Sequence, residues 1–394
     1  MRKRRIFTPG PTPLLPEAQL AMARPILHHR TREFSQLLHA TRGNLQRIFK
    51  SENDVVILSS SGTGAMEAAV GNLLGPEDRA LAVVAGKFGE RWVEICHAFD
   101  VPVVLLSKEY GTAAGADEIA AVLRSQPSIG ALLIQGCETS TGTRHDLEAI
   151  SRRLRREFPS VLTVVDAITA LGSQPVETER WSLDVVIGGS QKSFSISPGL
   201  SFLSLSARAV ERLASHRSGH YYFDLWREIQ AQRRGQTAFT PAVSLVEALY
   251  ESTQAILDQG LEQVLSEVDL LARSARAGLQ ALGFRLLSSS PANAVTAVFP
   301  PPGLSAPRLV EKLEERFDLK VAGGQGPLKG KIIRIAHLGY FDILDLFSFL
   351  SALELCLLEM GSKAERGAGL KAALEIASNS TVGGADLASS PQPG

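Results

Sequence analysis

The stretch Val185-Val186-Ile187-Gly188-Gly189-Ser190-Gln191-Lys192 decides the fold of this chain. Its first three residues are apolar and β-branched, which predicts a buried strand, and the two glycines end that strand. The strand therefore delivers Lys192, with small or polar neighbours, to the end of a sheet. A second apolar run, residues 161–165, ends in the same way on Asp166.

Lys192 and Asp166 are the two kinds of group that pyridoxal phosphate requires of a protein. A lysine amine forms a Schiff base with the aldehyde of this cofactor, and an acid pairs with its pyridine nitrogen. A lysine that follows a strand is, taken alone, more often a solvated surface residue. The pairing with Asp166 is what favours a cofactor site.

Composition excludes several classes of partner. The chain has 394 residues, enough for one large domain and a smaller one. Its 41 Lys and Arg balance its 41 Asp and Glu, so no global charge attracts nucleic acid or an anionic membrane. No apolar run is long enough to span a bilayer. The cysteines, Cys96, Cys137 and Cys356, are too scattered for a disulfide framework or a metal site, and we expect a cytoplasmic protein.

Short apolar runs of strand type alternate with helical patterns through the first 260 residues. This alternation predicts an α/β fold in which helices cover both faces of a mostly parallel sheet. Ligands of such sheets bind at the carboxyl ends of the strands, where Asp166 and Lys192 fall. The apolar runs are residues 55–58, 81–85, 101–106, 130–135, 161–166, 185–188 and 200–205.

The rest of the chain predicts a smaller α+β domain. A long helical pattern from Val243 to about Leu282, with a break near Gly260, leads out of the first domain. Further strand and helix patterns follow up to Met360. We predict a large domain over residues 17–260, a small domain with an N-terminal arm over residues 1–16 and 261–360, and a largely disordered tail over residues 361–394. Within this tail, residues 363–376 have a helical pattern, but the tail as a whole has little to bury.

Candidate cofactor contacts stand where strands turn into helices. Ser61, Gly62 and Thr63 open a helix after a strand, so their backbone N–H groups form a candidate phosphate site, although a plain capped turn also explains them. Phe88 opens another helix and either stacks on the pyridine ring or belongs to the core. Ser140, in the turn of residues 138–142, either bonds the phenolic oxygen of the cofactor or only shapes that turn.

Arg334 is the candidate substrate residue. It lies in a predicted strand of the second domain, and its guanidinium has the geometry to bind one carboxylate bidentately. A lone arginine of this kind more often makes a structural ion pair, so both readings remain open at this point.

These segments together resemble the class V, fold-type I aminotransferases that use pyridoxal 5'-phosphate, and above all the alanine–glyoxylate and serine–glyoxylate group. The resemblance extends over most of the chain, from Thr8 to Gly339. The segments that carry it are residues 8–12, 61–68, 138–142, 165–172, 189–192, 323–325 and 334–339.

The resemblance implies a seven-stranded type of sheet and a homodimer with active sites at the interface. Lys192 would hold the cofactor as a Schiff base and then move a proton, while Asp166 keeps the pyridine nitrogen protonated. The phosphate would be bound by Ser61, Gly62, Thr63 and Gln191, and by Thr240 of the neighbouring subunit. The other implied contacts are Phe88 on the ring, Ser140 near the phenolic oxygen and Arg334 on the substrate carboxylate.

The expected reaction moves an amino group from alanine or serine to glyoxylate or pyruvate, because Arg334 has no evident second cation beside it for a dicarboxylate. His29 and Arg30 qualify this expectation, since either would supply such a cation if it entered the site. One alternative is a cofactor-binding partner or regulatory subunit with little turnover, because proteins labelled as a soluble hydrogenase small subunit share a segment like residues 29–34. A cysteine desulfurase is the other alternative, but Cys356, the one cysteine after the lysine, lies in a core-type helical pattern.

Overall fold

A computed structural model describes residues 3–216 and 219–382 of the chain. The central feature is a sheet of seven strands in the order β2-β10-β9-β8-β5-β3-β4. All of its strand pairs are parallel except those of β10, which runs antiparallel to both β2 and β9. The strands are β2 (Asp54–Leu58), β3 (Ala80–Val84), β4 (Val103–Ser107), β5 (Ala131–Gln135), β8 (Leu162–Asp166), β9 (Val185–Gly189) and β10 (Ser201–Leu205). The seven predicted apolar runs are these seven strands, and the α/β class is confirmed.

Alternate residues of each strand face opposite layers of helices. Val55 and Ile57 of β2 pack toward one layer and Val56 and Leu58 toward the other, as the period of two in a strand requires. The first layer contains α2 (Arg32–Phe49), α5 (Ala116–Ser125), α6 (Leu147–Glu157) and α9 (Val243–Gln259), with α1 (Pro16–Met22) against α9. The second layer contains α3 (Gly62–Leu73), α4 (Lys87–Ala98), α7 (Ala207–Ser215) and α8 (Leu225–Gln232).

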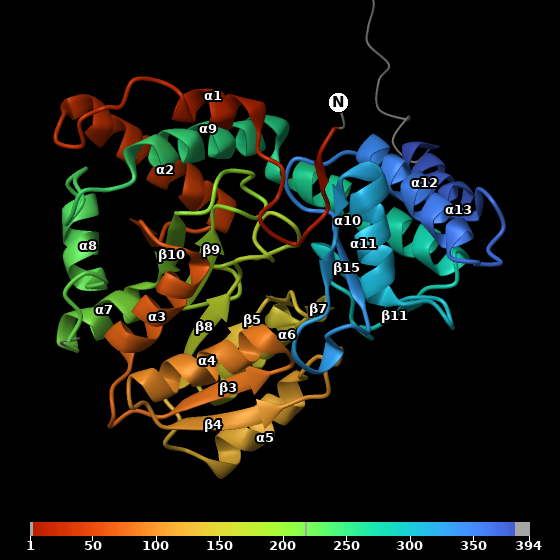
Figure 1. Ribbon diagram of the computed structural model, residues 1–394. Helices are drawn as coiled ribbons and strands as arrows, with labels where there is room; N and C mark the ends of the chain where they lie inside the picture. The colour runs from red at the N-terminus through yellow and green to blue at the C-terminus, as the bar shows by residue number, and fades with distance from the viewer. Residues whose placement is uncertain (1–2, 217–218, 383–394) are drawn as a thin grey trace, which may run out of the picture.

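The smaller part of the molecule lies to one side of this sandwich, on the right in Figure 1. Its core forms between helices and an antiparallel sheet of order β11-β12-β15-β14. Gly260, with φ of +90°, separates α9 from α10, so the predicted break in the long helix is confirmed. The elements are α10 (Leu261–Ala281), β11 (Arg285–Leu286), β12 (Val295–Phe299), α11 (Ala306–Phe317), β14 (Ala322–Gly323), the 3-10 turn η1 (Gly326–Leu328), β15 (Ile333–Ala336), α12 (Ile343–Glu359) and α13 (Ala368–Val382).

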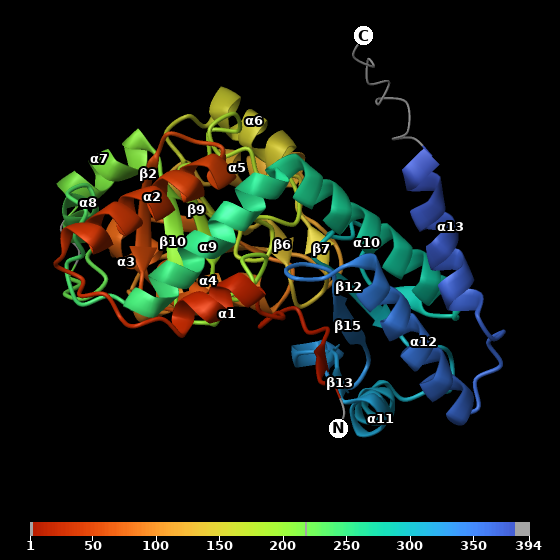
Figure 2. The same cartoon turned by 90° about the horizontal axis from the view of Figure 1, so that it is seen from above.

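The N-terminal segment ties the two parts together. Strand β1 (Arg5–Ile6) pairs with β13 (Leu319–Lys320) of the smaller part, as Figure 2 shows. The Phe7 ring is buried among the aromatic side chains of the smaller core. The chain then crosses to the large sheet, where Thr12 donates a hydrogen bond to the Lys192 carbonyl at 2.9 Å. A short hairpin, β6 (Cys137–Glu138) and β7 (Thr143–Arg144), lies at the same edge of the large sheet.

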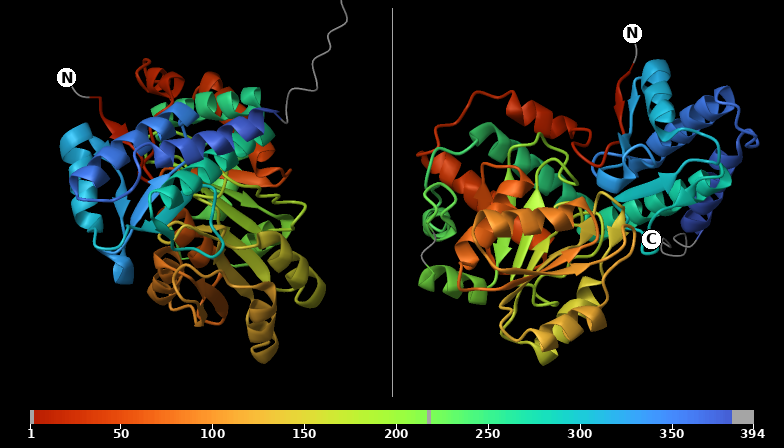
Figure 3. Two further views of the ribbon diagram at one scale, coloured as in Figure 1. Left: turned by 90° about the vertical axis from the view of Figure 1, so that its right-hand side faces the viewer. Right: turned by 60° about the horizontal axis from the view of Figure 1, so that its bottom comes forward.

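The tail differs from the sequence prediction. Residues 368–382 form α13, which packs on α10 and α12 where we predicted a largely disordered segment (Figure 3). The physical reason lies elsewhere in the chain: the Glu354 carboxylate of α12 accepts hydrogen bonds from the N–H groups of Gly367 and Gly369, which cap the start of α13. Such a distant cap leaves no signal in the local composition. Residues 383–394 lie outside the described residues.

Close packing of α10 on α12 and α13 gives a stability prediction. A Cβ added at Gly278 would lie 2.8 Å from a Leu350 methyl and 2.9 Å from the Gly369 carbonyl. We therefore expect Gly278→Val to lower the free energy of unfolding by about 1–3 kcal/mol through overpacking, measured by urea denaturation.

The matched control is Gly43→Val in α2, where an added Cβ meets nothing within 4 Å. This variant should unfold at or above the urea concentration of the unchanged protein, because valine favours a helix more than glycine does. If both variants lose the same stability, the packing of α13 is not the cause.

Candidate active site

Lys192 lies just beyond the carboxyl end of β9, with its ammonium group enclosed by protein. Burial lowers the pKa of this ammonium to about 8, and the nearby guanidinium groups of Arg334 and Arg91 act in the same direction. The ammonium donates a hydrogen bond to the Pro9 carbonyl of the N-terminal segment. At Gly10 an added Cβ would lie 2.4 Å from the lysine nitrogen, so this segment approaches Lys192 only because the residue is glycine.

Asp166 is the last residue of β8, the strand beside β9. Its side chain is buried, and burial raises the pKa of the carboxyl group to about 6, against the lowering effect of a 3.0 Å hydrogen bond from the Ile168 N–H. The Asp166 carboxyl is therefore ionised at neutral pH. A buried anion at this place suits a cationic partner such as a protonated pyridine nitrogen.

The start of α3 is where we predicted an anion site. Ser61 is the N-cap residue, yet no side chain caps the first turn of this helix. Its first N–H groups therefore remain directed at whatever lies before the helix. An added Cβ at Gly62 would lie 2.3 Å from the Ile168 side chain, so glycine lets α3 approach the Asp166 loop. Gln191 adds a buried amide oxygen with no hydrogen-bond partner in the described chain.

Phe88, in the first turn of α4, is half-buried and has a cation on its ring. The Arg91 guanidinium lies 4.7 Å from the centre of this ring. The same guanidinium donates a 3.1 Å hydrogen bond to the Thr63 hydroxyl. Arg91 thus links the residue expected to stack on the cofactor to the residue expected to bind its phosphate.

Ser140 is buried, and its hydroxyl is already engaged. It donates to the Glu138 carboxylate at 2.5 Å and accepts from the Lys87 N–H at 3.0 Å. The contact predicted for Ser140 with the phenolic oxygen of the cofactor stays a prediction. The buried Glu138 carboxylate also accepts from the N–H groups of Phe88 and Gly89, at 3.1 and 2.9 Å.

Arg334 reaches this group from the smaller part of the molecule. Only 7% of its surface is exposed, and burial lowers its pKa to about 10, while the charge of Glu138 acts in the opposite direction. Its N–H groups donate to the backbone carbonyls of Gly323 at 2.9 Å and Thr139 at 3.1 Å. Within the described chain no carboxylate lies within 4 Å of its nitrogens. Of the two predictions for Arg334, the structural ion pair is therefore absent from the described chain.

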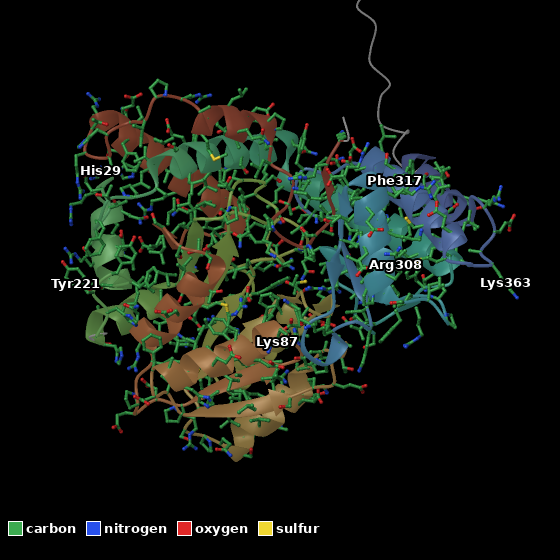
Figure 4. All side chains as sticks on the ribbon, in the orientation of Figure 1. His29, Lys87, Tyr221, Arg308, Phe317 and Lys363 are labelled. Carbon is green, nitrogen blue, oxygen red and sulfur yellow. The ribbon has the colours of Figure 1, made fainter. Side chains whose placement is uncertain are left out.

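The other predicted residues are Thr240, Arg30 and His29. Thr240 is exposed and lines a pocket with Leu58 and Ser59, just before Ser61 in the chain. The Arg30 guanidinium donates to the side chain of Gln236 and the carbonyl of Thr237, at 2.9 and 3.0 Å. His29 stacks on His28 at the far edge of the molecule from the labelled Lys87, the neighbour of Phe88, as Figure 4 shows. Within one chain, neither His29 nor Arg30 supplies the second cation of the site.

The cysteines and the helices give further findings. Cys96, Cys137 and Cys356 are buried and unpaired, and burial raises the pKa of each thiol. Buried thiols of this kind are poor nucleophiles, which disfavours the desulfurase alternative. Among residues 3–216 and 219–382 we find no group of side chains arranged to hold a metal ion. In the same ranges, every helix is too short or too polar to cross a membrane.

The residues present fit pyridoxal phosphate. The uncapped start of α3 suits its phosphate, and the buried Asp166 carboxylate suits its pyridine nitrogen. When bound, this cofactor supplies an electron-withdrawing ring that stabilises negative charge at the substrate α-carbon. Lys192, with its lowered pKa, is suited to hold the cofactor and to move a proton at that carbon.

Sequence reasoning missed the roles of Glu138 and Arg91. Glu138 follows the apolar run of β5 at the same edge of the sheet as Asp166, and this position was the available signal. Arg91 gave no signal, because its contacts with Phe88 and Thr63 depend on how α3 and α4 pack.

Comparisons with known proteins identify the family of this chain. The family model for aminotransferase class-V matches residues 18–329. A soluble hydrogenase 42 kDa subunit from Anabaena cylindrica is 38% identical, over 95% of this chain and 98% of its own. An L-aspartate–glyoxylate aminotransferase from Paracoccus denitrificans is 30% identical, over 94% and 95%. The crystal structure of an aspartate aminotransferase from Thermus thermophilus is 36% identical with a TM-score of 0.85, over 90% of this chain and 99% of that one.

The lowered pKa of Lys192 gives a pH prediction. Because the neutral amine is the nucleophile, the rate at which cofactor-free protein captures added pyridoxal phosphate should rise as the pH passes through about 8. An ordinary lysine would give this rise near pH 10.5. Stopped-flow measurement of the visible absorbance of the bound cofactor tests this, with Lys192→Ala as the control that gives no such absorbance. A rise centred near pH 10.5 would contradict the enclosed geometry of Lys192.

Proposed function

The chain belongs to the class V aminotransferases, and from this premise we propose that it transfers the amino group of alanine or serine to glyoxylate or pyruvate, with pyridoxal phosphate held by Lys192. The observation that carries the proposal is the buried, unpaired Arg334 guanidinium. Its two hydrogen bonds go to backbone carbonyls, so its charge is left for a ligand. A single guanidinium can bind one α-carboxylate through two parallel hydrogen bonds.

We propose one role for each of the predicted site residues. Lys192 holds the cofactor and moves the proton at the substrate α-carbon, and Asp166 keeps the pyridine nitrogen protonated. Ser61, Gly62, Thr63 and Gln191 surround the phosphate. In addition, Phe88 stacks on the ring and Ser140 lies near the phenolic oxygen. Glyoxylate as acceptor is supported by the name of the Paracoccus relative.

A second candidate donor is aspartate, and a specific observation favours it. The Arg91 guanidinium, which the sequence did not single out, lies close enough for its charge to act on both Lys192 and Asp166. It has no carboxylate within 4 Å in the described chain, so it offers a second cation for the distal carboxylate of a dicarboxylic donor. Both the Paracoccus and the Thermus relatives are named for aspartate.

A donor panel tests the proposal. With glyoxylate as acceptor, we expect kcat/KM for alanine or serine to exceed that for aspartate and glutamate by about tenfold or more, because a second carboxylate would lose its hydration without a dedicated partner. A preference for aspartate would move the assignment to the second candidate. If no donor reacts and the visible absorbance of the cofactor stays unchanged, the protein is a cofactor-binding partner, as the Anabaena relative's name suggests for that protein.

Arg334→Lys is the control within this panel. The variant keeps a positive charge but loses the planar fork, so KM for every donor should rise while the order of preference stays the same. An unchanged KM would show that another group binds the α-carboxylate.

We further propose a homodimer in which Thr240 reaches the phosphate of the partner subunit. Mixing inactive Lys192→Ala with Thr240→Asp, whose carboxylate repels a phosphate, should restore activity. Hybrid dimers then carry one site with both side chains intact. Random exchange predicts about a quarter of the unchanged activity, since about half of the dimers are hybrids with one good site of two.

Sedimentation at the assay concentration completes this test. If the subunits exchange and no activity returns, Thr240 does not contribute to the partner's site. If the protein is fully active as a monomer, the proposed homodimer is not needed for activity.

A further inference from the structure

Glu138 is a buried acid for which the proposed reaction assigns no step. Its side chain has no exposed surface, and burial raises the pKa of its carboxyl group even though several hydrogen bonds act to lower it. A glutamate is seldom buried unless its oxygens are bonded. Here all of the bonds join it to the turns that carry Phe88 and Ser140.

The hydrogen bonds of Glu138 converge from two segments. The N–H groups of Phe88 and Gly89, in the first turn of α4, donate to its oxygens at 3.1 and 2.9 Å. The Ser140 N–H and hydroxyl donate to the other oxygen at 3.1 and 2.5 Å. A negative charge at the start of a helix is also favoured by the helix dipole. The carboxylate therefore fixes where α4 begins relative to the sheet.

Gly86 shows how tight this arrangement is. An added Cβ there would lie 2.4 Å from the Ser140 hydroxyl oxygen and 2.5 Å from the Glu138 carboxyl carbon. The residue before α4 thus has no room for a side chain. Any displacement of Glu138 must move the first turn of α4 and the Phe88 ring with it.

We propose that Glu138 is a positioning residue, whose buried carboxylate holds the first turn of α4 so that the Phe88 ring faces the cofactor. The Arg91 guanidinium lies 4.7 Å from the centre of that ring, and Glu138 holds the backbone from which the ring extends. This inference rests on the cofactor of the proposed function, and it does not depend on which amino acid is the donor.

A double-mutant cycle on cofactor binding tests the proposal. We would titrate cofactor-free protein with pyridoxal phosphate and follow the visible absorbance. Glu138→Gln keeps one oxygen and replaces the other with an NH2 group, so the N–H groups of either α4 or Ser140 lose their acceptor. This change should weaken binding about tenfold or more. In a Phe88→Ala background the same change should have little effect, because Glu138 acts through Phe88.

The controls separate positioning from general damage. Glu94→Gln removes an exposed carboxylate from the same helix and should leave the affinity unchanged. If urea denaturation shows that Glu138→Gln is not folded, Gly86→Ala replaces it in the cycle. The added methyl group would press on the Glu138 carboxyl group and the Ser140 hydroxyl and so disturb the same turn. Equal losses of affinity with and without Phe88, or no loss in either variant, would overturn the proposal. Failure of the donor panel would leave this binding result standing, so the two proposals fail separately.

Discussion

The structure depends on burying four charged side chains at one edge of a sheet without pairing them to each other. Asp166, Glu138 and Arg334 are buried and Lys192 is half-buried, and no ion pair within 4 Å joins any of them to another residue of the described chain. Each is held by backbone groups instead: carbonyls for the two cations and N–H groups for the two anions. Fixed dipoles satisfy part of the charge of Lys192, Asp166 and Arg334 and leave the rest for ligands, whereas the bonds of Glu138 all stay within the protein.

The sheet topology explains why these groups meet. Strands β5, β8 and β9 run parallel, so Glu138, Asp166 and Lys192 emerge at the same edge although long stretches of chain separate them. Arg334 comes from another sheet, and hydrogen bonds between the two parts of the molecule hold it there. The N-terminal segment pairs with the smaller part at β1 and bonds the Lys192 loop at Thr12, and the Ala292 N–H donates to the Gly142 carbonyl at 2.9 Å.

The sequence predicted what depends on local pattern. Apolar runs with glycine at their ends located the strands, and the residues at strand ends, such as Lys192 and Asp166, gave the candidate chemistry. Prediction from the sequence failed where a feature depends on a contact between distant segments. The helix α13 depends on the Glu354 carboxylate of another helix, and the Arg91 contacts depend on the packing of α3 against α4. The helical pattern of residues 363–376 indicated part of α13, but nothing in the tail or in α4 indicated the residues that they contact.

The preferred amino donor depends on how many cationic side chains of the site can bind a substrate carboxylate. Arg334 alone can bind one carboxylate, and a donor with a second one must find another cation or lose hydration energy. Arg91 is the candidate for that cation, but its guanidinium already donates to the Thr63 hydroxyl and lies on the Phe88 ring. A dicarboxylic donor would have to share this guanidinium with the turn expected to bind the phosphate. A small neutral donor makes no such demand, and this difference is the physical argument for alanine or serine over aspartate.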